Sequence, residues 1–159
     1  MLEKAKSIQS NMVSWRRDFH KHPELGFNET RTSAKVAEVL ESLGCRVTTG
    51  VGKTGVVGEL GKGKPIIGIR ADMDALPILQ AKDVPYKSSK DGVMHACGHD
   101  AHTAILLGTA EILSKEDLSG TVRFFFQPSE EMEYDEGISG APRMIADGAM
   151  QDVDAVIAL

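Results

Sequence analysis

Three consecutive phenylalanines, Phe124, Phe125 and Phe126, constrain the fold of this chain more than any other feature. Neighbouring side chains of a strand point to opposite faces of a sheet, so a strand over 121–126 is apolar on both faces. Such a strand is typical of a sheet that is covered on both sides. The apolar run at 155–159 predicts a second buried strand, beginning at Asp154.

Helical periodicity alternates with these strands. Apolar residues three or four positions apart predict a helix that Pro23 ends and a second over 30–43 with Gly44 as its left-handed cap. Further helices are expected from about residue 101 and over 142–147. Strands are expected at 45–48 and on both sides of the turn 61–64, where a β-hairpin is predicted, and 78–94 is interpreted as a long loop. The expected fold class is therefore α/β, a layered mixed sheet with helices on both faces.

Composition excludes some classes of function. The 159 residues carry 18 Lys and Arg against 23 Asp and Glu, a formal charge of −5, which argues against a nucleic-acid partner. No apolar run approaches the roughly 20 residues that a membrane helix needs, and no signal peptide is visible. Cys45 and Cys97 are too few for a disulfide framework. We therefore expect a cytoplasmic protein without a membrane partner.

Polar residues gather at three places where a predicted strand ends or a loop meets a helix. These are the segments 70–74 (Arg-Ala-Asp-Met-Asp), 95–102 (His-Ala-Cys-Gly-His-Asp-Ala-His) and 127–131 (Gln-Pro-Ser-Glu-Glu). Active sites of α/β sheets lie at such positions. The three segments are therefore expected to share one site.

The segment 95–102 offers His95, Cys97, His99 and His102 as potential metal ligands, with Asp100 as a possible orienting partner. A thiolate and an imidazole suit Zn²⁺ or a similar borderline ion. The alternative is a polar loop that caps a helix, with the cysteine as a small buried hydrophobe.

The two acidic segments also have two interpretations each. Of Glu130 and Glu131, one could bind a metal while the other acts as general base; alternatively both belong to an acidic surface loop, as the acids at 133, 135 and 136 are expected to. Asp72 and Asp74 could serve a metal site, or pair with Arg70 in a salt bridge. Taken together, the three segments favour one site for one or two divalent metals and a hydrolytic reaction.

The sequence resembles the metal-dependent amidohydrolases of the aminoacylase and carboxypeptidase superfamily, in the branch of hippurate hydrolase, N-acyl-amino-acid amidohydrolases and auxin-conjugate hydrolases. The resemblance covers essentially the whole chain, and its most specific motif is Cys-Gly-His-Asp-Ala-His-Thr at 97–103. The other matching stretches are 16–26, 69–78, 126–131, 148–150 and the last strand.

This resemblance implies a role for each matching residue. Cys97, His99 and Glu131 would be metal ligands, and Glu130 would be the general base that takes a proton from a metal-activated water and gives it to the leaving amine. Asp74 would orient a ligand. The role of Asp72 stays open, because relatives outside this branch have a ligand His at its position. We expect structural roles for the signature residues at 20, 22 and 24 (His, His and Glu).

The resemblance also implies what surrounds the site. Residues 1–159 would form the N-terminal part of a catalytic domain, without the inserted lid or dimerisation domain and the C-terminal part, which contributes further His ligands. The full-length form is expected to bind up to two divalent metals (Zn, Mn, Co or Ni), to act on small N-acyl amino acids and to be a homo-oligomer. The fragment itself is expected to have little or no activity; the alternative is a catalytically dead metal-binding or interaction module.

Overall fold

A computed structural model describes residues 1–131 and 137–159 of the chain. The acids predicted to form a surface loop at 133, 135 and 136 lie outside the described residues. The helices are α1 (Leu2–Ser7), α2 (Gln9–Lys21), α3 (Thr30–Ser42), α4 (His99–Leu113) and α5 (Gly140–Ala146). The strands are β1 (Arg46–Val51), β2 (Gly55–Gly61), β3 (Ile66–Asp72), β4 (Thr121–Gln127) and β5 (Ala155–Ala158).

The strands form one mixed sheet in the order β1-β2-β4-β3-β5. β4 is central: it pairs antiparallel with β2 and parallel with β3. Its three phenylalanines are all buried, as their sequence predicts. Phe124 and Phe126 belong to one hydrophobic core and Phe125 to another on the opposite face.

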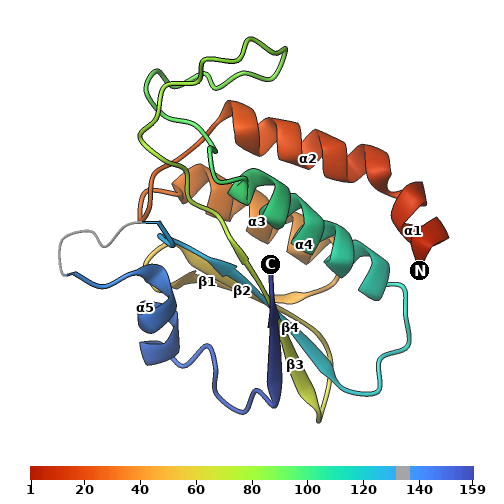
Figure 1. The fold of residues 1–159 in the computed structure, drawn as a ribbon. Coiled ribbons are helices and arrows are strands. Elements are labelled where there is room, and N and C mark those ends of the chain that lie inside the picture. Colours follow the sequence, from red (N-terminus) through yellow and green to blue (C-terminus); the bar gives the residue numbers. More distant parts are fainter. Residues whose placement is uncertain (132–136) are drawn as a thin grey trace.

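Helices cover both faces of this sheet (Figure 1). The helices α2, α3 and α4 lie on one face, where Val36, Leu40, Leu106 and Leu107 pack in the larger core. The other face carries α5, whose Met144 packs in the smaller core. The predicted α/β fold with a layered mixed sheet is therefore confirmed.

The hairpin predicted around residues 61–64 is wrong. The strands on both sides of this segment, β2 and β3, do not pair, because β4 lies between them. The segment crosses over the start of β4, where the Lys62 amide donates to the carbonyl of Gly120. A Cβ on Gly61 would lie 2.2 Å from that same carbonyl oxygen, so this close crossing requires glycine. Turn residues predict a reversal of the chain, but not which strand fills the space beside it.

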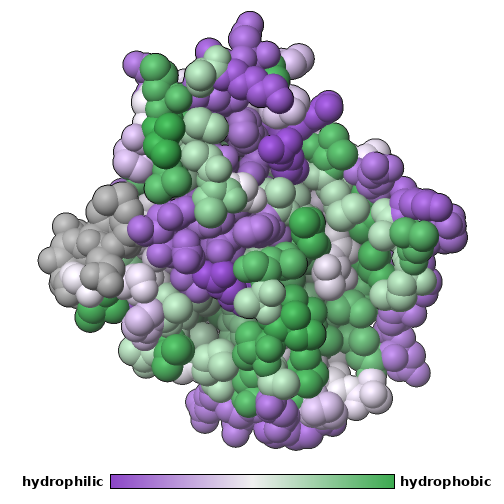
Figure 2. All heavy atoms as spheres, viewed as in Figure 1, coloured by the Kyte–Doolittle hydropathy of each residue, from purple (hydrophilic) through white to green (hydrophobic). Residues whose placement is uncertain are grey.

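Two further expectations need correction. The first predicted helix is two helices, α1 and α2, which meet at the buried residue Ile8. The last strand exists as β5, but its side chains are exposed rather than buried because it pairs only with β3 at the edge of the sheet. Figure 2 shows the hydrophobic surface that gathers over β5 and the neighbouring α5 segment. Its exposed members are Ile145, Met150, Val156, Ile157 and Leu159.

The long loop expected at 78–94 lies within the segment 73–98, which contains no helix and only isolated bridges, Leu25 with Ala75 and Leu76 with Met94. The first bridge fixes the start of this loop against the residues that follow α2. Among the described residues, no helix is both long and apolar enough to cross a membrane.

Candidate metal centre

The parallel pairing of β3 and β4 brings the predicted polar segments to one edge of the sheet. Asp72 at the end of β3 lies opposite Gln127 at the end of β4, so the residues that follow both strands emerge side by side. The loop 73–98 then leads into α4, which begins at His99. The three segments therefore meet at one site, as their positions in the sequence predict.

Cys97, His99 and Glu131 each offer one donor atom, and these three atoms lie within 4.8 Å of one another. His99 is buried, whereas Cys97 is exposed. Gly98 between them has a φ of +93°, a left-handed conformation that residues with a Cβ rarely adopt. This local turn brings both neighbours of Gly98 to the same site at the start of α4.

Asp74 fixes the orientation of the His99 ring. Nδ1 of His99 donates to the carbonyl oxygen of Asp74 at 2.9 Å and lies 3.2 Å from its carboxylate, which leaves Nε2 for the site. Burial alone lowers the pKa of His99, but the hydrogen bond to Asp74 and the charges of Asp72, Asp74 and Glu131 outweigh it and raise the pKa above its ordinary value. The pKa of Asp74 is lowered, because hydrogen bonds from His99 and from the amides of residues 130 and 131 outweigh its burial.

The two glutamates approach the same ring nitrogen. Nε2 of His99 lies 3.8 Å from Oε2 of Glu130 and 3.7 Å from Oε1 of Glu131. The side chain of Glu130 is 40% exposed and that of Glu131 is 21% exposed. The acidic pair therefore lies at the site, with the side chain of Glu130 more open to solvent than that of Glu131.

The donor set fits a divalent cation. Oε1 of Glu131 is buried and accepts no hydrogen bond from the described residues, which is unfavourable for a carboxylate oxygen unless a cation compensates. The hydrogen bond to Glu131, burial and the nearby carboxylates raise the pKa of Cys97 to about 11. A cation at these atoms would offset the repulsion between the neighbouring negative charges and would give the unpaired Glu131 oxygen a partner. One thiolate, one imidazole and one carboxylate suit Zn²⁺ and similar ions.

A second group, Asp72, His99 and His102, also has its donor atoms within 4.8 Å of one another. Asp72 accepts hydrogen bonds from Nη1 of Arg70 at 2.8 Å and from Nδ1 of His102 at 2.7 Å. The salt bridge considered for Asp72 therefore exists. Asp74, in contrast, faces His99 rather than Arg70.

Asp100, a possible orienting partner, and His95, a potential ligand, lie outside both donor groups. The Asp100 carboxylate accepts hydrogen bonds from Nε of Arg16 at 2.9 Å and Nδ1 of His20 at 2.8 Å, so it connects α2 to α4, while Asp74 orients His99. His95 belongs to neither donor group, and both its ring nitrogens lack a hydrogen-bond partner within the described residues. Burial lowers the pKa of His95 to about 4.

Of the signature residues near the N-terminus, His20 contacts the distant Asp100, whereas His22 and Glu24 make local contacts. Nδ1 of His22 donates to the carbonyl of Asp18, and the carboxylate of Glu24 accepts from the amide of Thr32 at 2.8 Å, which caps α3. Sequence reasoning did not identify Arg16 as a partner of Asp100. Its spacing of four from His20 places both on one face of α2 and could have indicated a shared partner.

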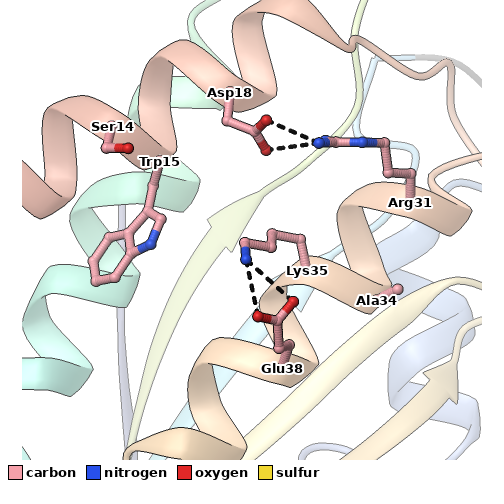
Figure 3. A pocket seen from close by; sticks show the side chains of 7 residues that line it. All are labelled: Ser14, Trp15, Asp18, Arg31, Ala34, Lys35 and Glu38. Carbon is pink, nitrogen blue, oxygen red and sulfur yellow. Dashed lines mark hydrogen bonds and ion pairs between the residues drawn. The ribbon is translucent and has the colours of Figure 1, made fainter.

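A cavity of about 560 Å³ lies apart from this site, between α2 and α3 (Figure 3). Trp15 lines it, and its charged residues pair with each other: Asp18 with Arg31 at 2.8 Å and Lys35 with Glu38 at 3.0 Å. None of its lining residues belongs to either donor group.

Comparison with known proteins points to one family. The model of peptidase family M20/M25/M40 matches residues 68–159. The hippurate hydrolase of Campylobacter jejuni is 45% identical over 150 residues, which cover 93% of this chain and 38% of that protein. The N-acyl-L-amino acid amidohydrolase of Geobacillus stearothermophilus is 44% identical over 154 residues, covering 94% of this chain and 40% of that protein.

A solved structure points to the same family. The Bacillus subtilis YXEP protein, described as a dinuclear metal binding peptidase from the M20 family, superimposes with a TM-score of 0.88 at 41% identity, over 96% of this chain and 43% of that one. The chain thus spans about two fifths of the length of the proteins it matches. The residues matched by the family model include β4, β5, most of β3 and every residue of the two donor groups. The chain therefore belongs to peptidase family M20/M25/M40.

Proposed function

We propose that this protein hydrolyses the amide bond of N-acyl amino acids or small acylated peptides, with a divalent cation held by Cys97, His99 and Glu131. The observation that carries the proposal is the convergence of these three donor atoms within 4.8 Å, with the carboxylate of Glu130 beside them. The names of the related hippurate hydrolase and N-acyl-L-amino acid amidohydrolase support this substrate class. In this proposal, residues 1–159 are part of the catalytic domain.

The cation would be Zn²⁺, Mn²⁺, Co²⁺ or Ni²⁺, since all four accept nitrogen together with oxygen or sulfur ligands. When bound, it supplies Lewis acidity, which polarises the scissile carbonyl and lowers the pKa of water. The dinuclear description of the related peptidase supports up to two cations in the complete site.

The residues of the chain divide the remaining work. Glu130, which lies 3.8 Å from Nε2 of His99, takes a proton from the attacking water as the carbon–oxygen bond forms. The same carboxyl group then gives the proton to the amine nitrogen as the carbon–nitrogen bond breaks. Asp74 keeps Nε2 of His99 directed into the site through its contacts with Nδ1. The products are a carboxylic acid and a free amino acid.

The proposal is tested with the complete gene product, stripped with a chelator and reloaded with each of the four cations. Release of free amine is measured from benzoyl-glycine, acetylated amino acids and indole-acetyl amino acids. We expect hydrolysis of at least one of these acyl classes, lost in the stripped protein and restored by reloading. Stoichiometric cation binding without hydrolysis of any acyl class would contradict the proposal and favour a metal-binding module without catalytic activity.

A further inference from the structure

Glu29 is a buried carboxyl group for which the proposed reaction has no direct use. It precedes α3, and its side chain has no exposed surface. Burial raises the pKa of Glu29 to about 7, against hydrogen bonds from Thr54 and Ser129 that lower it. A buried acid is unfavourable unless its oxygens are hydrogen-bonded, so its two contacts indicate what it does.

Both oxygens of Glu29 contact segments that are distant in the sequence. Oε1 accepts a hydrogen bond from the backbone amide of Ser129 at 2.8 Å, and Oε2 accepts one from the Thr54 hydroxyl at 2.5 Å. The Thr54 carbonyl in turn accepts from the hydroxyl of Ser33 in α3. Glu29 therefore connects the start of α3 and the β1–β2 turn to the segment that leaves β4.

Ser129 directly precedes the two glutamates of the candidate metal centre and has an unfavourable backbone conformation. Its φ is +42°, in the left-handed region, which a residue with a Cβ retains only where its neighbours fix it. Its carbonyl accepts from the amide of Gly140 at 2.9 Å, and a Cβ on Gly140 would lie 1.7 Å from the carbonyl oxygen of Pro128. The bend at Ser129 is thus held by Glu29 at its amide and by α5 at its carbonyl.

We propose that Glu29 is a positioning residue, which holds the bend at Ser129 so that Glu130 and Glu131 are directed toward His99. The metal-ligand and base roles of these two glutamates rest on the proposed function. The contact of Glu29 with Ser129 and the backbone bend do not. Substituting a residue that orients a metal ligand without touching the metal typically lowers the affinity for that metal 10–100-fold.

Capping of α3 does not account for the Glu29 side chain. Although Glu29 occupies the N-cap position, its carboxyl group makes no capping hydrogen bond. Two first-turn amides of α3 are instead satisfied by the carboxylate of Glu24, which accepts from Arg31 at 3.1 Å and from Thr32 at 2.8 Å. Glu24 is 7% exposed and also precedes α3, so it is a matched control that lacks a contact with Ser129.

The experiment compares Glu29→Ala, Glu29→Gln and Glu24→Ala in the complete gene product. The first readout is amide hydrogen exchange at Ser129, measured without metal or substrate. The second is the affinity for Co²⁺, followed by the absorbance of its thiolate complex. We expect Glu29→Ala to accelerate exchange at Ser129 at least 10-fold and to weaken Co²⁺ binding 10–100-fold. Glu29→Gln keeps an oxygen acceptor and should stay within about threefold of the unmodified protein on both readouts.

Glu24→Ala should lower the melting temperature while leaving exchange at Ser129 and Co²⁺ affinity within about threefold. Equal effects of Glu24→Ala and Glu29→Ala on both readouts would overturn the proposal. Unchanged Co²⁺ affinity in Glu29→Ala would overturn it too. If Glu29→Ala does not fold, Glu29→Asp is used, since it keeps the charge but shortens the reach and should accelerate exchange at Ser129. If the unmodified protein binds no metal or hydrolyses no amide, the proposed function fails, and the exchange rates still support or overturn the hold of Glu29 on Ser129.

Discussion

The backbone carbonyl and the carboxylate of Asp74 both lie against Nδ1 of His99, at 2.9 and 3.2 Å. The other carboxylate oxygen of Asp74 accepts from the amide of Glu131 at 3.0 Å. One aspartate after β3 therefore aligns a histidine from α4 and a glutamate that follows β4. This arrangement makes Asp74 the residue on which the relative position of the two expected ligands depends.

We predict that Asp74→Asn weakens Zn²⁺ or Co²⁺ binding 10–100-fold, because the ring of His99 and the backbone at Glu131 lose a charged acceptor. Isothermal titration calorimetry of the metal-free protein measures the affinity for the cation. Glu111→Gln is the control, since Glu111 is also buried but lies near the C-terminal end of α4, where its carboxylate accepts a hydrogen bond from Asn11 of α2. Equal metal affinity in both variants would contradict the orienting role of Asp74.

Cys97 should be protected from alkylation by bound metal. Cys97 is exposed and Cys45 is buried, so the metal-free protein is expected to react first at Cys97. Zn²⁺ should slow this reaction at least 10-fold, and a chelator should restore it, because a coordinated thiolate is unavailable to the reagent. Mass spectrometry of the labelled peptides follows both cysteines separately. An equal rate at Cys97 with and without metal would rule it out as a ligand.

Glu130→Gln should abolish most of the hydrolysis while leaving the metal content unchanged. The substitution keeps the shape of the side chain but removes the proton acceptor, which typically lowers kcat by about 10²–10⁴-fold. Turnover of the best acyl substrate and the metal content are measured on the same preparation. Glu131→Gln is the comparison, in which metal content and turnover should fall together. A Glu130→Gln protein with near-normal kcat would eliminate Glu130 as the base.

Glu29 should make stability depend on pH. Its pKa is raised from 4.5 to about 7 on folding, so the folded state binds the proton more tightly than the unfolded state. Between these values the free energy of unfolding therefore falls as pH rises, by about 3 kcal/mol in total. Relative to Glu29→Gln, which cannot ionise, the unmodified protein should lose stability from about pH 4.5 to 7. Urea unfolding at several pH values measures the difference, and parallel pH profiles would contradict the burial of a titrating Glu29.

Local sequence patterns predicted much of the fold. The stripe of Val36, Val39 and Leu40 located α3 to within one residue of its end, and Gly44 does adopt the left-handed conformation expected of its cap. The pattern failed where neighbours in space are distant in the chain. Nothing local to residues 61–64 reveals that β4, some sixty residues later, inserts between β2 and β3.

For the site, positions after strands were sufficient to group the three polar segments, which the structure brings together. The choice of Asp74, Cys97, His99 and Glu131 rested on the family resemblance, because residue types alone left a polar loop, an acidic surface loop and a salt bridge as alternatives. The identity of their partners was not contained in these patterns. Asp100, considered as a possible orienting partner of a ligand, accepts hydrogen bonds from Arg16 and His20 of α2, which lie some 80 residues away in the chain.

The sequence by itself determined the layered α/β fold and the residue types that gather at the candidate metal centre, since periodicity and donor chemistry are properties of short segments. Only the tertiary structure decided the order of the strands, the pairing of Asp74 with His99, and the contact of Glu29 with Ser129. These depend on which distant segments become neighbours when both faces of β4 are buried. A hydrogen bond across 100 residues, such as that from Ser129 to Glu29, leaves no local signal in the chain.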